Sequence, residues 1–140
     1  MYEFEFTTEL NAPRDAVWKV WSDMTSYPEW DPRELELRLD GPFAAGTAGY
    51  SKQKGNPGGV FRVVEVDAPS GWKNVSPLPG GELLISHRLE KLGDLCTKLT
   101  KTYRVTGPLE LLFRIWFAPA LRRAQPASFA ALATRVAARP

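Results

Sequence analysis

Three side chains on two predicted strands carry groups that could transfer protons: His87, Lys101 and Tyr103. They stand at positions where alternation assigns the apolar face of the strands 83–89 and 97–105. A short turn between these strands would pair them and bring both apolar faces into one pocket. A histidine or lysine removed from water has a lowered pKa, which suits it to act as an acid or a base near neutral pH.

A purely structural role is the alternative for the same residues. A bulge or an early end of either strand would turn Lys101 toward solvent, and His87 would then be a hydrogen-bonded histidine of the core. If both side chains face the pocket, their positive charges repel, so at least one should be neutral near pH 7. We therefore predict that His87 is neutral, with a pKa below the ordinary value of about 6.5.

Other catalytic chemistries find little support in the sequence. His87 is the only histidine and Cys96 the only cysteine, so neither a zinc site nor an internal disulfide is expected. No Gly-x-Ser-x-Gly elbow is present for a serine nucleophile. The glycine-rich stretch 55–59 lacks the Lys-Ser/Thr that completes a phosphate-binding loop, and it predicts a turn. We accordingly expect no metal and no cofactor.

The composition is that of an ordinary globular protein, because 44% of the 140 residues are hydrophobic and 24% are charged. This length predicts one domain, residues 1–140. The formal net charge is only +2 and the basic residues are dispersed, which argues against nucleic acid as a partner. The lone cysteine suits a reducing compartment, and no signal peptide or uncharged run of transmembrane length is visible. We therefore expect a cytoplasmic protein without membrane insertion, and its oligomeric state stays open.

The candidate residues require a sheet to position them. Alternating or β-branched segments predict strands over residues 2–10, 34–39, 46–53, 60–66, 72–75, 83–89 and 97–105. The connections from residue 39 onward are short turns, so consecutive strands should pair in an antiparallel meander. In the strand 34–39, alternation places three leucines on one face and the charged residues Glu34, Glu36 and Arg38 on the other.

After residue 108 the hydrophobic period becomes helical. The predicted apolar stripe comprises Leu109, Leu112, Phe113, Trp116, Phe117 and Leu121. We expect this helix to bury Trp116 against the sheet, and we expect Pro119 and Pro126 to bend or break it. A helix of this kind could also bind a membrane, but its apolar face is needed to close the sheet, which favours the intramolecular role.

Residues 12–32 predict a short helix, a break and a buried tryptophan directly after the first strand. Pro13 suits the first turn of a helix, and Pro28 disfavours helical angles at the residue before it. The segment contains Ala12-Pro13, Val17-Trp18, Asp23 and Tyr27-Pro28-Glu29-Trp30. This arrangement resembles the opening of the START/Bet v 1-like (SRPBCC) superfamily, most closely its polyketide cyclase/dehydratase-like branch.

The resemblance implies an α+β helix-grip fold, in which a curved antiparallel sheet of about seven strands wraps around a long C-terminal helix. Two short helices follow the first strand. One helix cannot fill the concave side of a strongly curved sheet, so we expect an apolar cavity there, with a dry packed core as the alternative. The residues expected to line the cavity are Trp18, Leu37, Tyr50, Ile85, Leu99, Phe113, Trp116 and Phe117.

The expected ligand is a hydrophobic or aromatic small molecule such as a polyketide, a lipid or an isoprenoid. The resemblance also implies cyclisation or dehydration of polyketides, with His87, Lys101 and Tyr103 as candidate catalytic residues. The family offers no fixed catalytic motif, so enzymatic activity stays open. The alternative is a regulatory or assembly factor that binds another protein through the same groove. A polar pair in the cavity would favour the enzyme, an apolar lining a carrier, and an exposed apolar patch on the order of several hundred Å2 a protein partner.

Overall fold

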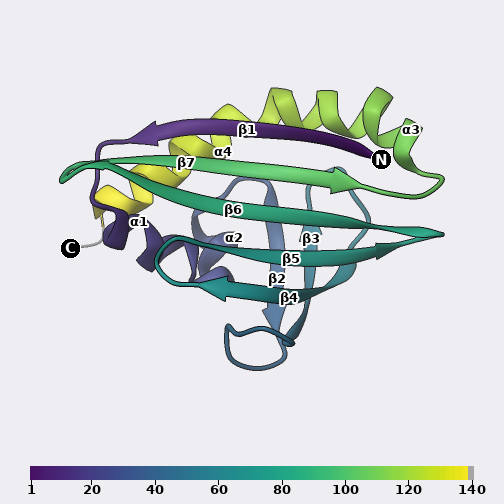
Figure 1. Ribbon diagram of the computed structural model, residues 1–140, viewed down its shortest axis with the longest axis horizontal. Coiled ribbons are helices and arrows are strands. Elements are labelled where there is room, and N and C mark those ends of the chain that lie inside the picture. Colours follow the sequence, from purple (N-terminus) through teal and green to yellow (C-terminus); the bar gives the residue numbers. More distant parts are fainter. Residues whose placement is uncertain (139–140) are drawn as a thin grey trace.

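The computed structural model describes residues 1–138 and confirms the predicted antiparallel meander from residue 34 onward, whereas the first strand pairs with the last strand and not with the second. The strands are β1 (Tyr2–Leu10), β2 (Glu34–Leu39), β3 (Ala48–Gln53), β4 (Gly59–Asp67), β5 (Gly71–Leu78), β6 (Gly81–Gly93) and β7 (Cys96–Val105). They form one sheet in the order β1-β7-β6-β5-β4-β3-β2, and each neighbouring pair is antiparallel. Figure 1 shows the long strands β1, β7, β6 and β5 side by side.

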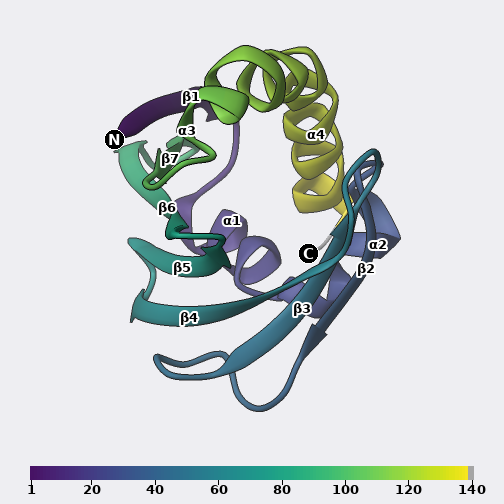
Figure 2. The ribbon, with the colours of Figure 1, turned by 90° about the vertical axis from the view of Figure 1, so that its right-hand side faces the viewer.

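The helical elements pack on the concave side of this sheet. They are α1 (Arg14–Trp21), the 3₁₀ turn η1 (Met24–Ser26), α2 (Tyr27–Trp30), α3 (Glu110–Leu112), the π-helical turn η2 (Phe113–Phe117) and α4 (Ala118–Ala138). Figure 2 shows the sheet curling around toward α4, which lies across the open side of the curl. This is the helix-grip arrangement that the family resemblance implies. Within residues 1–138, no helix is both long enough and apolar enough to span a membrane.

Two apolar clusters hold the helices on the sheet. One joins α1 and α4 to β5, with Val17, Trp72 and Leu132 at most 2% exposed. The other joins β7 to the C-terminal helix, with Val105 and Leu121 equally well buried. Each such side chain contributes about 1.5–3 kcal/mol when it is withdrawn from water, so these clusters account for the position of both helices.

The strand β2 differs from its predicted alternation. The pairing of β2 with β3 shifts register between Glu34 and Glu36, which marks a β-bulge. A bulge reverses the side-chain alternation beyond it, so Glu34 and Leu37 both face inward while Leu35 is 55% exposed. The expectation that Glu34 lies on the charged outer face is therefore wrong, because Glu34 is only 5% exposed.

The start of the C-terminal helix also differs from its predicted stripe. Phe113 and Leu121 are buried as expected, but Leu112 is 52% and Trp116 is 72% exposed. The π-helical turn η2 ends two residues before Pro119, a residue that has no N–H and crowds the carbonyl four residues earlier. The wide turn accommodates this proline. The burial expected for Trp116 is wrong, because the buried stripe runs through Phe113 and Leu121 and leaves Trp116 at its edge.

Two further expectations about prolines and tryptophans are modified. The helix α4 continues through Pro126, so this residue does not break it. Trp30 is half-buried rather than buried, and its ring lies edge-on to Tyr27 at 5.2 Å between centroids. Trp30 packs against the first apolar cluster and also lines the pocket described below, so it is both a packing residue and a wall residue.

Candidate functional site

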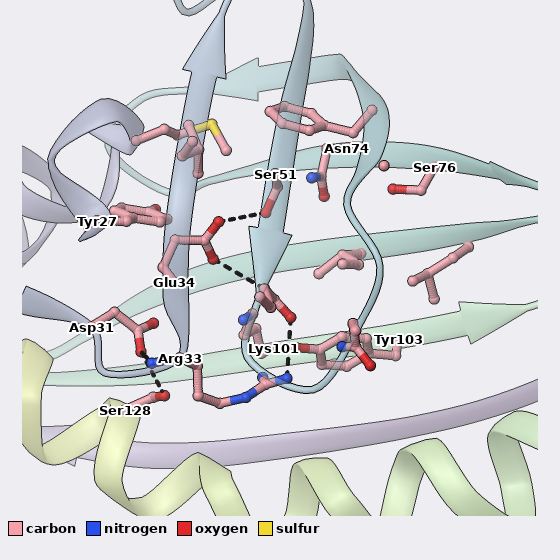
Figure 3. A pocket seen from close by; sticks show the side chains of 18 of the residues that line it. Tyr27, Asp31, Arg33, Glu34, Ser51, Asn74, Ser76, Lys101, Tyr103 and Ser128 are labelled. Atoms are coloured by element: carbon pink, nitrogen blue, oxygen red, sulfur yellow. Dashed lines mark hydrogen bonds between the residues drawn. The ribbon is translucent and has the colours of Figure 1, made fainter.

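A pocket with a volume of about 810 Å3 lies between the concave face of the sheet and the helices. This volume is within the range of small-molecule sites. Its apolar walls include Trp21, Phe61, Trp72, Ile85, Phe129 and Leu132. Figure 3 shows polar side chains directed into the same space, among them Glu34, Asn74, Lys101 and Tyr103. The pocket therefore combines an aromatic lining with a few polar groups, so it is not the wholly apolar lining expected of a simple carrier.

His87 lies in an aromatic sandwich at one end of this pocket. Its ring stacks on Trp72 at 3.6 Å between centroids and meets the edge of Trp21 at 5.0 Å. Its Nδ1 lies 3.2 Å from the carbonyl oxygen of Trp72, which can only accept a hydrogen bond, so Nδ1 carries the proton. Burial lowers the pKa of His87 well below its usual value, and the positive charge of Lys101 lowers it further. His87 is therefore neutral near pH 7, as predicted, with a lone pair on Nε2.

Lys101 and Tyr103 follow on the neighbouring strand in the predicted register. His87 on β6 stands directly opposite Lys101 on β7, and the register shift of this pair lies beyond them, near Gly93. The Lys101 Nζ lies 5.4 Å from the centroid of the Tyr103 ring, and that ring stacks on Phe4. The bulge that would have turned these residues outward is absent from this part of the described sheet, so all three candidates line one pocket.

Glu34 is a pocket residue that the sequence reasoning missed. Its carboxylate accepts hydrogen bonds from the Ser51 hydroxyl and, at 3.1 Å, from Nε2 of Gln53. The Arg33 guanidinium donates to Oε1 of the same Gln53 side chain at 3.1 Å. Burial raises the pKa of Glu34, although both hydrogen bonds and the charge of Lys101 act in the opposite direction. A carboxyl group in this environment is shifted toward its neutral, proton-donating form.

The position of Glu34 depends on the bulge in β2, for which the sequence carries no clear signal. Its surroundings also come from distant parts of the chain. Asp31 accepts hydrogen bonds from the Arg33 backbone N–H and from the Ser128 hydroxyl of α4, both at 3.0 Å. This contact connects the loop before β2 to the C-terminal helix. The polar end of the pocket is therefore assembled by tertiary contacts.

Five of the eight predicted lining residues line the pocket: Leu37, Ile85, Phe113, Trp116 and Phe117. The other three do not. Leu99 is fully buried in the first apolar cluster, and Trp18 packs against Phe43 at the edge of that cluster. Tyr50 alternates with the pocket residue Ser51 on β3, and the Arg38 guanidinium lies over its ring at 5.5 Å. Leu99 and Trp18 differ from expectation because they pack in or against the apolar core. Tyr50 differs because its side chain lies on the face of β3 that points away from the pocket.

The described part of the chain has no cluster of side chains suited to bind a metal ion. Among residues 1–138, no group of three or more histidine, cysteine or acidic side chains is placed to hold a metal ion. Cys96 lies at the far end of β7, with its Sγ 3.8 Å from Oε1 of Glu9. The pocket's own groups offer acid–base chemistry, since a neutral imidazole, an ammonium and a buried carboxyl lie along one cavity.

Comparison with known proteins agrees with the fold described above. The family model described as polyketide cyclase / dehydrase and lipid transport matches residues 1–137. The Zhui aromatase/cyclase of Streptomyces sp. R1128 superposes with a TM-score of 0.79 at 16% identity, covering 99% of this chain and 94% of that one. A START superfamily protein of Mycobacterium smegmatis gives 0.71 at 15% identity, covering both chains completely. At such identities these structures establish the fold alone.

A di-domain protein extends the comparison. The di-domain ARO/CYC BexL of the BE-7585A biosynthetic pathway matches with a TM-score of 0.77 at 16% identity. All of this chain is covered but only 48% of BexL, so the chain corresponds to about half the length of that protein. No curated protein matches the sequence.

Proposed function

The chain belongs to the polyketide cyclase/dehydrase and lipid transport family, and from this premise we propose that its pocket binds a hydrophobic or aromatic small molecule such as a polyketide, a lipid or an isoprenoid. The observation that carries the proposal is the pocket of about 810 Å3 with its aromatic walls. Burial of an aromatic ligand against Trp72 and Phe61 would withdraw apolar surface from water on both sides. The volume of the pocket is large enough for a ligand of several rings.

Cyclisation with dehydration is the activity that the polar residues of this pocket support. In the cyclisation step, a base removes a proton from carbon next to a carbonyl group, and that carbon bonds to a second carbonyl carbon. The second carbonyl oxygen takes a proton and becomes a hydroxyl group. In the dehydration step, a second proton leaves the neighbouring carbon and the protonated hydroxyl departs as water. Both steps are redox-neutral and need only a base, an acid and a folded substrate.

The pocket residues suit these roles in different ways. The lone pair on Nε2 of neutral His87 can accept the carbon-bound proton, and the Lys101 cation opposite it can stabilise the resulting enolate. Tyr103, beside Lys101, and Glu34, at the other end, are the candidate proton donors. The pocket walls would hold the bound substrate in a folded shape. This brings its reacting atoms close together and so lowers the barrier to ring closure.

Native mass spectrometry of the purified protein tests the binding proposal. We expect a co-purifying small molecule on the wild-type protein. Ile85→Trp should displace it, because the larger side chain fills the pocket. Val64→Trp is the matched control, since Val64 is 41% exposed and does not line the pocket. Equal ligand occupancy in the two variants would overturn the proposal, because the bound molecule would then lie elsewhere.

A second candidate function is binding of a protein partner, and one observation favours it. Four large apolar side chains at the start of the C-terminal helix are more than 50% exposed: Leu111, Leu112, Ile115 and Trp116. They lie beside the pocket, because Leu112 and Trp116 also line it. A photo-crosslinking residue at position 116 should capture one discrete partner if this function operates, and the same residue at position 64 should not. Labelling that is equally diffuse at both positions would exclude it.

A further inference from the structure

Beyond Glu110 the chain has positively charged side chains but no acidic ones. All 16 Asp and Glu residues lie at or before this position, whereas five of the 18 Lys and Arg residues follow it. Residues 111–124 consist only of apolar residues and arginines. The formal net charge of the whole chain is +2, so the C-terminal segment is basic and the rest of the chain is slightly acidic. A basic amphipathic helix of this kind is typical of contact with a lipid surface or with a helix-binding protein.

Apolar and cationic side chains of this segment share one exposed face. Leu111 and Ile115 lie one helical turn apart, and both are more than half exposed. Arg122 follows Ile115 by seven residues, or about two turns, a spacing that keeps side chains on one side of a helix. Arg123 stands in the same relation to Trp116. We call this surface the helix face, and it comprises Leu111, Leu112, Ile115, Trp116, Arg122 and Arg123.

The arginines of the helix face have no intramolecular counter-ion. Neither Arg122 nor Arg123 forms an ion pair with any of residues 1–138. The acidic residue nearest to them in the sequence is Glu110. Its carboxylate already lies 2.7 Å from the N-terminal amine and 4.0 Å from a guanidinium nitrogen of Arg114. The helix face therefore presents positive charge to an anionic surface that approaches it.

The helix face adjoins the mouth of the pocket. Leu112 and Trp116 belong to this face and also line the pocket. Val60, at the start of β4, is a lining residue that is more than half exposed as well. Apolar side chains from the helix and from the sheet therefore reach solvent at the mouth. A hydrophobic molecule dissolves in a bilayer far better than in water, so a mouth with an apolar rim suits direct contact with a bilayer.

We propose that the helix face is a docking surface for an anionic lipid bilayer. Its four apolar side chains enter the boundary between headgroups and acyl chains, while Arg122 and Arg123 contact lipid phosphates and carboxylates. Trp116 suits this boundary because an indole combines an apolar body with one polar N–H. The inference goes beyond the proposed function, because Leu111 and Ile115 do not line the pocket and docking requires no molecule bound there.

The composition of the helix face favours a bilayer over a protein partner. Specific protein interfaces combine apolar contacts with directed hydrogen bonds. Residues 111–124 contain no serine, threonine, asparagine, glutamine or acidic residue, so apart from the arginines only the Trp116 indole can form such a bond through its side chain. A bilayer surface has no fixed pattern of donors and acceptors, and it binds helices through apolar burial and positive charge.

Co-sedimentation with lipid vesicles tests the inference on wild-type protein. One set of vesicles contains phosphatidylcholine alone, and the other contains phosphatidylcholine and phosphatidylserine in equal parts. We expect at least about tenfold tighter binding to the anionic vesicles, and we expect this preference to decrease as salt is added.

Two pairs of substitutions test the apolar part of the helix face. Leu111→Ser with Ile115→Ser should weaken binding to the anionic vesicles at least about tenfold, because apolar burial is lost. Leu92→Ser with Leu95→Ser is the matched control, since both leucines are more than half exposed at the β6–β7 hairpin. None of these four residues lines the pocket, so ligand occupancy in native mass spectrometry should stay at the wild-type level.

Two further pairs test the charge of the helix face. Arg122→Glu with Arg123→Glu should abolish the preference for phosphatidylserine, because the anionic surface then repels the helix. Lys19→Glu with Arg88→Glu is the matched control, since it changes the net charge by the same amount at two exposed cations outside the helix face. Figure 1 shows α1, which contains Lys19, at the end of the molecule opposite α3.

Each result either supports the docking surface or rejects it. Equal binding of wild-type protein to both kinds of vesicle, or no binding to either, would overturn the inference and leave ligand binding in the pocket intact. Capture of one discrete protein at position 116 without vesicle binding would assign the helix face to a protein partner and also reject it. Equal losses in the face variants and in their controls would have the same meaning. The wild-type comparison needs no substitution, so it decides the matter even if a variant fails to fold.

Discussion

The two ends of the pocket shift the pKa of an ionisable group in opposite directions. At one end His87 is enclosed by indole rings and has a single hydrogen bond to the backbone. At the other end Glu34 lies in a side-chain network with Ser51 and Gln53. Burial lowers the pKa of His87 and raises the pKa of Glu34, so both groups are shifted toward their neutral forms. One cavity can therefore present neutral His87 as a proton acceptor at one end and protonated Glu34 as a proton donor at the other.

Removal of the aromatic wall should have the largest effect on this arrangement. Trp72 is 1% exposed and stacks on His87. Trp72→Ala should lower the free energy of unfolding by about 3–5 kcal/mol, because it leaves a cavity in the first apolar cluster. Urea denaturation measures this loss. A loss below about 1 kcal/mol would show that the His87 end is loosely packed.

Titration of His87 is the next test of the comparison. Its pKa in the folded protein lies well below the usual 6.5, so the unfolded chain binds a proton first as the pH falls. The contribution to stability is therefore present above about pH 6.5 and is lost as the pH falls through the folded-state pKa. NMR of the imidazole should show a neutral ring at pH 7, and His87→Gln should flatten the acid side of the stability curve. A His87 imidazole that titrates above pH 6.5 would contradict the conclusion that burial lowers its pKa.

The Glu34 end should respond to pH with the opposite sign. Its folded-state pKa is raised above 4.5, so the folded protein holds a proton that the unfolded chain has already released. This contribution is fully present below the unfolded-state pKa and is lost as the pH rises through the folded-state pKa. Glu34→Gln keeps the shape without the charge, so its stability relative to wild type should increase with pH. Urea titrations at several pH values measure this, and a difference that does not vary with pH would contradict the raised pKa.

The smallest effect is expected at the pocket mouth, away from both ends. Trp116 lines the pocket but is 72% exposed. Trp116→Ala should change the free energy of unfolding by less than about 0.5 kcal/mol, because little packed surface is lost. Thermal or chemical denaturation of Trp116→Ala and Trp72→Ala in parallel compares the two losses in the free energy of unfolding. A loss of several kcal/mol would mean that Trp116 packs as the helical stripe alone predicts.

The acceptor end of the pocket could be derived from the sequence, whereas the donor end could not. His87 and Lys101 lie on adjacent strands joined by a short turn, so alternation and one hairpin were enough to place them opposite one another. Glu34 begins a strand with equally regular alternation, yet a bulge reverses its face. A bulge depends on how the backbones of two strands pair, so the hydrophobic pattern of one strand cannot predict it.

The sequence by itself determined the meander, the long C-terminal helix and the neutral histidine, because these follow from local periodicity and from the cost of burying charge. Only the tertiary structure decided which apolar residues line the cavity and which fill the core. The leucine at 99 and the tryptophan at 116 both belong to regular apolar patterns, but Leu99 is fully buried and Trp116 is largely exposed. Their difference arises because the curvature of the sheet determines how closely the helix approaches it, and that curvature depends on all the strands and not on one segment.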